Sequence, residues 1–279
     1  MSVWLCIPSK RPPQEAEKVL KLWRKRGYRI ALFLDDWRFE NRTYDRILSG
    51  FTTGGYPGYA NAVNALVKDV AYMDSTAEWF IAAGDDVEPD LNHSAEEIAI
   101  ECSSYFGRIN GVYKVECLNF YQDPDLSARG ILGRPDSTFG VMQPTGDRWG
   151  DSTVSRQRYG QNRGAYIDRV CGSAWIGREF AKRVNQGNGP LWPEYKHQFV
   201  DEELQEVATK LGVFWQRPDL IQLHRHWGRG PEAAPNMPGQ LERMPEFLKE
   251  ANSPEHWEKY KTLLEKRKAA GFPGSELLP

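Results

Sequence analysis

The stretch Phe80-Ile81-Ala82-Ala83-Gly84-Asp85-Asp86 decides the fold class of this chain. It begins inside a wholly apolar run, residues 79–83, and stops at two adjacent carboxylates. A short apolar run that ends at a turn signal is typical of a strand buried on both faces of a parallel sheet. Two earlier runs have the same form: residues 3–7, followed by Pro8-Ser9-Lys10, and residues 29–34, followed by Asp35-Asp36. The sequence therefore predicts three buried strands that each end in polar residues.

Helical patterns separate these strands. Residues 15–26 place Val19, Leu22 and Trp23 on one stripe, and residues 59–72 follow a Gly-rich segment at 52–58. Ser94 with Glu97 forms a capping box for a third helix that we expect to run to about residue 105. Strand-helix alternation of this kind predicts a doubly wound α/β sheet, in which ligands bind at the carboxyl ends of the strands.

Composition and missing motifs narrow the function classes. The 279 residues carry a net charge of -2, which argues against a protein that coats nucleic acid by charge alone. No GxGxxG follows the first strand and no GxxxxGK[ST] occurs, so neither a dinucleotide site of the Rossmann type nor a P-loop is supported. The four cysteines lie far apart without zinc spacing, and no apolar run has membrane length. We therefore expect reduced thiols, no membrane span and a cytoplasmic protein.

The second half of the chain is less regular. Residues 114–169 are rich in Gly, Pro and Asp, and short helices are expected at 180–184 and 201–211, followed by a strand at 213–215. After Gly230 comes a linker at 231–238 and then two helices, the last with Ser253 as its cap and Pro254 at its first position. We expect residues 1–230 to form one domain, with residues 231–279 as a linker and helical appendage that packs on it.

Two groups of side chains point to chemistry at the strand ends. Adjacent carboxylates such as Asp85 and Asp86 repel each other and need a cation, and Mg²⁺ or Mn²⁺ prefers such oxygen ligands. A histidine from Gln222-Leu223-His224-Arg225-His226-Trp227 could complete the same coordination sphere. His224 and His226 are two residues apart and share a face in an extended segment, so the register alone does not choose between them.

A third signal is Asp201, which opens the amphipathic helix expected at 201–211. It lies three residues before Leu204 and seven before Ala208, so it shares their face and can look into a cleft. The alternative is a purely local role at the helix start, as a cap or a partner of the helix dipole.

Together these residues resemble the GT-A glycosyltransferases, particularly family-2-like enzymes and their bacteriophage relatives, over about residues 3–230. The resemblance implies a GT-A-type, Rossmann-like central mixed sheet flanked by helices, a nucleotide-sugar donor and a divalent metal. Gly84-Asp85-Asp86 is similar to the family's DXD motif, although Gly84 replaces its first acid. By this resemblance Asp86 would bind the metal, Asp85 the ribose or the metal, and His224, with His226 as the substitute, would be the late metal ligand.

The same resemblance implies a donor pocket and a general base. Asp201 is similar to the family's catalytic base, which would deprotonate an acceptor hydroxyl and give inversion, although retaining enzymes share the metal site. A UDP-sugar is the donor that we expect first. The donor pocket would be formed by the strand ends, one helix start and a small-residue loop: Pro8, Ser9, Lys10, Arg11, Asp35 or Asp36, Asn61, Asn64, Gly172 and Ser173.

The acceptor and the rival classes stay open. Arginines and tyrosines alternate over residues 156–169, which could track phosphates and stack on a flipped base. A hydroxymethylated pyrimidine in phage DNA is therefore one acceptor, and a polysaccharide, a lipid-linked sugar or a protein is another. A nucleotidyltransferase would share the carboxylates and metal, and a non-catalytic carbohydrate- or nucleotide-binding module would share the aromatic residues, but the module would not need Asp201 and His224.

Overall fold

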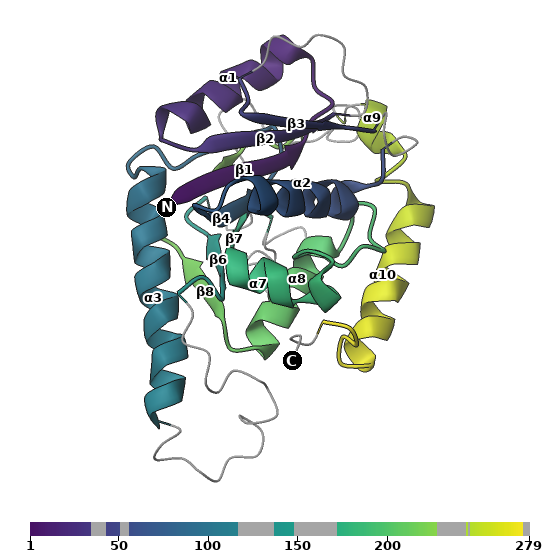
Figure 1. The fold of residues 1–279 in the computed structure, drawn as a ribbon. Helices are drawn as coiled ribbons and strands as arrows, with labels where there is room; N and C mark the ends of the chain where they lie inside the picture. The colour runs from purple at the N-terminus through teal and green to yellow at the C-terminus, as the bar shows by residue number, and fades with distance from the viewer. Residues whose placement is uncertain are drawn as a thin grey trace.

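The computed structural model describes residues 1–34, 43–50, 56–116, 137–147, 172–227, 244 and 246–275. Within these residues the centre is a seven-stranded mixed sheet with the strand order β3-β2-β1-β4-β7-β6-β8 (Figure 1). The strands are β1 (Ser2–Pro8), β2 (Arg29–Leu34), β3 (Arg46–Ser49), β4 (Ala77–Ala82), β6 (Val141–Pro144), β7 (Ala174–Gly177) and β8 (Phe214–Arg217). A central mixed sheet flanked by helices was predicted, and the structure confirms it.

The first four strands run parallel, whereas β7 is antiparallel to both β4 and β6. Residues of β1, β2 and β4 are almost all buried, as expected for apolar runs covered on both faces. Because β1 and β4 pair in parallel, with Cys6 opposite Ala82, their carboxyl ends lie next to each other. This pairing brings the polar residues that follow the two strands to one edge of the sheet.

Apart from α3, the helices with predicted bounds begin and end close to them. The main helices are α1 (Pro13–Lys25), α2 (Tyr59–Met73), α3 (Ala95–Glu116), α7 (Arg178–Arg183), α8 (Val200–Lys210), α9 (Glu246–Lys249) and α10 (Pro254–Ala269), and a 3₁₀ turn, η2, covers Asn185–Gly187. Ser94 and Glu97 form the predicted capping box, with Glu97 N 3.2 Å from Ser94 Oγ and Ser94 N 2.7 Å from the Glu97 carboxylate. Helix α3 runs eleven residues beyond the predicted end at Tyr105, because buried Phe106 and Asn110 continue its inner stripe.

Helix α10 packs against α8 and the residue before it, Phe199, and lies on the side of the molecule away from α3 (Figure 1). One contact of α10 is a buried ion pair in which Arg267, 6% exposed, donates to both carboxylate oxygens of Glu203 on α8 at 2.7–2.9 Å. The Tyr195 hydroxyl donates to the same carboxylate at 2.7 Å, and the guanidinium lies 3.4 Å from the centre of the Trp192 ring. The pair fixes α10 to α8, the helix whose first turn contains Asp201, the predicted catalytic residue.

Within the described residues no helix has both the length and the apolar character needed to span a bilayer. Cys6 and Cys102 are free thiols in the core, and burial raises the pKa of each above its ordinary value. Cys117 and Cys171 lie outside the described residues.

Candidate active site

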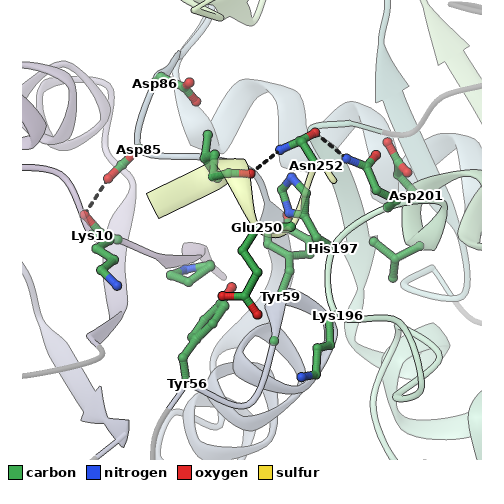
Figure 2. A pocket seen from close by; sticks show the side chains of 18 of the residues that line it. Lys10, Tyr56, Tyr59, Asp85, Asp86, Lys196, His197, Asp201, Glu250 and Asn252 are labelled. Carbon is green, nitrogen blue, oxygen red and sulfur yellow. Dashed lines mark hydrogen bonds between the residues drawn. The ribbon is translucent and has the colours of Figure 1, made fainter. Parts of the chain in front are cut away.

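A cavity of about 640 Å³ lies at the carboxyl ends of β1 and β4 (Figure 2). Its walls come from the loop after β1, the start of α2, the turn after β4, the start of α8, the segment around a short strand, β9 (Leu223–His224), and the C-terminal helices. The lining residues of these segments fall within 8–11, 56–59, 84–86, 196–201, 224–227 and 248–260, respectively, although not every residue of each range lines the cavity. Segments from both ends of the chain therefore form the walls of one cavity.

The acidic turn after β4 is held by groups from the loop after β1. The Ser9 hydroxyl donates to Asp85 Oδ2 at 2.6 Å, and Arg11 Nε lies 2.8 Å from Asp85 Oδ1. The other end of the Arg11 guanidinium, NH2, lies 2.7 Å from Asp86 Oδ2. One guanidinium thus bridges the two neighbouring carboxylates and compensates the repulsion that the sequence predicts between them.

The two carboxyls differ in their acidity. Burial raises the pKa of Asp85 above its ordinary value, although the Ser9 hydroxyl and the Arg11 charge act in the opposite direction. Burial also opposes ionisation of Asp86, but His224 and then Arg11 outweigh it and hold the pKa of Asp86 well below its ordinary value. Asp86 is therefore the carboxylate that stays ionised most firmly at neutral pH.

His224 stands beside Asp86 because of a small two-stranded sheet. Strand β5 (Val87–Glu88), directly after the acidic turn, pairs antiparallel with β9, so that Val87 lies opposite His224. The backbone N–H of Arg225 donates to the Asp86 carbonyl at 2.7 Å, and Asp147 Oδ2 lies 3.3 Å from the backbone nitrogen of His224. This frame brings His224 Nε2 to 3.4 Å from Asp86 Oδ1. His226 also lines the cavity, with its ring centre 5.1 Å from that of His224.

Gly84 has a steric reason to differ from the first acid of a DXD motif. A Cβ atom at this position would lie 2.5 Å from Asp86 Oδ1. That oxygen faces His224, while the other oxygen of Asp86 is bound by Arg11. A side chain at position 84 would therefore have to displace the Asp86 carboxylate from its partners.

The described residues fit a divalent ion only in part. Asp86 and His224 offer a carboxylate oxygen and an imidazole nitrogen side by side, a donor pair that suits Mn²⁺. Within the part of the chain that the structure describes, no group of three or more His, Cys, Asp or Glu residues could hold a metal ion. Mg²⁺ and Mn²⁺ prefer six ligands, so most of the ligands would have to come from a bound diphosphate and water.

Asp201 lies in the first turn of α8 and lines the cavity. Figure 2 draws its side chain across the cavity from Asp85, close to Asn252. The chain turns into α8 at Phe199, whose φ of 67° is left-handed, and the Phe199 ring packs against Trp257 of α10 at 4.8 Å. Burial raises the pKa of Asp201 above its ordinary value, against smaller opposing effects of backbone hydrogen bonds from Asp201 and Glu202 and of nearby His224. The carboxyl is therefore a better proton acceptor than an exposed aspartate.

Several predicted donor-site residues make other contacts. The amide of Asn64, 4% exposed, exchanges two hydrogen bonds with the backbone of Leu191 at 2.7 and 3.0 Å, and Asn61 donates to the Pro193 carbonyl at 2.8 Å. Ser173 is buried, and its carbonyl and hydroxyl oxygens both lie 2.9 Å from the side-chain amide of Gln222. Among the described residues that line the cavity, Asn61, Asn64, Gly172 and Ser173 are absent. These amides are engaged in holding backbone segments together, so they do not face the cavity.

Other predicted residues cannot be placed. Asp35 and Asp36, expected near the nucleotide base, lie outside the described residues. The arginines and tyrosines of residues 156–169, expected to contact a DNA acceptor, lie outside them as well.

Sequence reasoning missed the C-terminal wall of the cavity. Leu248, Glu250 and Asn252 line it, and Asn252 accepts a hydrogen bond from the side chain of Gln198, which precedes α8. Figure 2 shows Glu250 extending into the cavity between Tyr56 and Lys196. The segment lies in what reads as a linker and appendage, and no local pattern in it marks a site.

Comparison with known proteins gives a weak structural likeness. No protein-family model and no curated protein sequence matches the chain. Among solved structures it is similar to the catalytic domain of a Drosophila β1,4-galactosyltransferase 7 in complex with xylobiose, with a TM-score of 0.41 and 13% identity. The match covers 86% of this chain and 78% of that one. At this TM-score the likeness carries no argument about function, which rests on the cavity itself.

Proposed function

We propose that the protein is a glycosyltransferase that moves a sugar from a nucleotide-sugar donor to an acceptor hydroxyl. The observation that supports this best is the joining, in one cavity, of the Ser9–Arg11 loop, the Asp85–Asp86 turn and Asp201. The loop offers positive charge for a diphosphate, the turn offers ionised oxygen next to an imidazole, and Asp201 offers a proton acceptor. Transfer of a glycosyl group from a diphosphate requires these three chemical functions.

The donor would lie along the β1 and β4 ends. Lys10 and Arg11 line this part of the cavity and suit the two phosphates, since a guanidinium binds phosphate through paired N–H groups. Asp85 suits a ribose hydroxyl. Tyr56 lines the same wall, with its ring centre 6.4 Å from that of Phe33, and offers a ring face for the base. A UDP-sugar is the donor that we propose first.

We further propose that Asp86 and His224 hold a divalent ion, Mn²⁺ or Mg²⁺, together with the donor diphosphate, and that His226 stays on the cavity rim beside Trp227. Such an ion, when bound, neutralises charge that develops on the leaving diphosphate. The 3.4 Å between Asp86 Oδ1 and His224 Nε2 supports this choice of the first histidine over the second.

Asp201 would act as the general base. Its carboxylate takes the proton of the acceptor hydroxyl while the acceptor oxygen forms a bond to the anomeric carbon. The bond from that carbon to the phosphate oxygen breaks at the same time, and the nucleoside diphosphate leaves with the electron pair. Attack from the side opposite the leaving group inverts the anomeric centre.

The acceptor would enter beside the C-terminal wall. The described residues there are a mixture of Glu250, Asn252 and Lys196, which suits a hydroxyl-rich, uncharged molecule such as a glycan more than a phosphate backbone. A hydroxymethylated pyrimidine in DNA stays a prediction of the sequence, because its expected contacts lie outside the described residues. A cytoplasmic location is likewise still a prediction.

The test is turnover with a panel of UDP-, GDP- and dTDP-sugars, with and without Mn²⁺, with glycans or hydroxymethylated DNA as acceptor. Release of nucleoside diphosphate with a glycosylated product supports the proposal. Pyrophosphate exchange would indicate a nucleotidyltransferase, and tight nucleotide binding without turnover would indicate a binding module. Asp201→Asn should lower this turnover, because it removes the proposed general base. Glu202→Gln is its matched control, since Glu202 is the next carboxylate in α8 and is not among the described residues that line the cavity.

A further inference from the structure

Arg11 occupies the place between the two carboxylates where a cation is expected. Its Nε is 2.8 Å from Asp85 and its NH2 is 2.7 Å from Asp86, and the three side chains are only 11–19% exposed. Charge attraction from Asp86 and Asp85 raises the pKa of Arg11 in spite of the opposing effect of burial, so the guanidinium stays charged. The protein thus carries its own counter-ion for the acidic turn.

This counter-ion conflicts with a divalent ion on the same turn. The guanidinium binds Asp86 Oδ2, which leaves Oδ1, on the His224 side, for another cation. A divalent ion at that oxygen would lie close to the positive charge of Arg11 in a cavity with limited access of water, where like charges repel more strongly than in bulk solvent. The described side chains also supply too few ligands to offset that repulsion.

We propose that Arg11 is a resident counter-ion that makes metal binding conditional on the nucleotide. In the nucleotide-free protein the guanidinium bridges Asp85 and Asp86 and keeps affinity for divalent ions low. When a nucleoside diphosphate enters, Arg11 exchanges the Asp86 carboxylate for phosphate oxygens, to which its N–H groups are equally suited. Asp86 is then released to a divalent ion, and the diphosphate adds oxygen ligands. This inference rests on the proposed function, because it assigns the diphosphate of the donor to this cavity.

The exchange predicts positive coupling between metal and nucleotide. Each ligand should tighten the other by the same factor, because coupling between two bound ligands is reciprocal. A typical coupling corresponds to about 5–150-fold in affinity. Loss of Arg11 should act in opposite directions on the two ligands: Mn²⁺ alone should bind more tightly, and nucleoside diphosphate alone should bind more weakly.

The experiment is titration of the full chain with Mn²⁺, following the electron paramagnetic resonance signal of free Mn²⁺, alone and then with saturating UDP, GDP or dTDP. The wild-type protein should bind Mn²⁺ weakly alone and about 5–150-fold more tightly with at least one of the nucleotides. Arg11→Gln should bind Mn²⁺ at least about tenfold more tightly than wild type without nucleotide, and the coupling should shrink. Arg11→Lys keeps the charge but cannot bridge both carboxylates with the same fork, so it should fall between them.

Lys10→Gln is the matched control for the nucleotide-free titration, because it removes the same charge from the same wall. In Figure 2 the Lys10 ammonium points away from Asp85. Equal effects of Lys10→Gln and Arg11→Gln would reduce the result to general electrostatics and overturn the inference, as would wild-type Mn²⁺ affinity in Arg11→Gln. Circular dichroism and thermal melting of each variant check that the fold is retained.

The outcome separates this inference from the proposed function. Metal–nucleotide coupling that depends on Arg11, without any sugar transfer, would refute the transferase and leave the counter-ion role intact. Sugar transfer that persists in EDTA, or wild-type Mn²⁺ binding that no nucleotide improves, would refute the counter-ion exchange and leave the transferase standing.

Discussion

Replacing Arg267 by methionine should destabilise the protein severely, because it strands a buried charge. Glu203 is 2% exposed, and three of the four hydrogen bonds to its carboxylate come from Arg267. In Arg267→Met the Tyr195 hydroxyl is the remaining partner among these contacts. Removing one member of a buried ion pair typically costs about 3–5 kcal/mol. For a chain of this size, about 2 °C per kcal/mol converts this cost to a fall in Tm of roughly 6–10 °C.

The neighbouring pair Lys268–Glu206 provides the control. Its side chains are 57% and 40% exposed, so Lys268→Met should cost no more than about 1 kcal/mol. Adding Glu203→Gln to Arg267→Met should recover much of the loss, since the amide removes the buried charge and can still accept from Tyr195. Urea unfolding and thermal melting measure all four proteins. If Arg267→Met cost no more than Lys268→Met, the reasoning from the buried pair would be refuted.

Three further predictions follow from the site and the sheet. Gly84→Ala should weaken Mn²⁺-dependent UDP binding in calorimetry by at least about tenfold, because the added Cβ displaces Asp86. Gly107→Ala is the control and should have no effect, because the nearest neighbour of its added Cβ lies at 3.5 Å. Equal affinities of the two variants for UDP would show that Asp86 can shift at no cost. Asp201→Asn should lower turnover by about 10²–10⁴-fold, because it removes the proposed proton acceptor. Burial raises the pKa of Asp201, so wild type loses stability as pH rises from 4 to 8, and the Tm of the variant should rise relative to that of wild type. A constant difference in Tm would contradict the raised pKa. Asp74 accepts hydrogen bonds from Thr76, Ser2 and Trp4, which hold its pKa well below the ordinary value despite burial, and it also accepts from Arg29. Asp74→Asn should therefore lower Tm at pH 7 by an amount that shrinks below about pH 4, and a deficit of equal size at pH 2 would argue against it.

The parts of the fold that could be predicted are those with a strong local signal. Strands β1, β2 and β4 each contain a continuous apolar run, and Ser94 and Ser253 are caps whose hydrogen bonds the structure confirms. Strand β3 escaped prediction because it has four half-buried residues at an edge, one of them Arg46, which binds Asp69. The antiparallel placement of β7 between β4 and β6 depends on long-range pairing, across about 100 residues in the case of β4, which local patterns do not encode.

The residues of the site also fall into two groups, those that a local sequence signal predicts and those that depend on distant packing. Convergence of the β1 and β4 ends followed from the parallel sheet, so Ser9, Arg11 and Asp85 could be expected together. That Arg11 bridges both carboxylates could not, because it depends on the direction of one long side chain. The side-chain amide of Asn64 could bind a ligand, yet its partner is the backbone of Leu191, more than 120 residues away in sequence. Distant packing, which a single sequence does not display, decides such roles.

The walls of the cavity come from segments far apart in the sequence, so they leave the ribosome at different times during synthesis. Residues 8–11 leave the ribosome well before Glu250 and Asn252, and before Arg267 on the following helix, α10. Domains begin to fold during synthesis from the N-terminal side, so the sheet and its acidic turn can form on a nascent chain that still lacks one wall. An unfinished or prematurely terminated polypeptide would thus have a half-built cavity. Full enclosure of the cavity therefore requires synthesis to reach the segment that holds Glu250, Asn252 and Arg267.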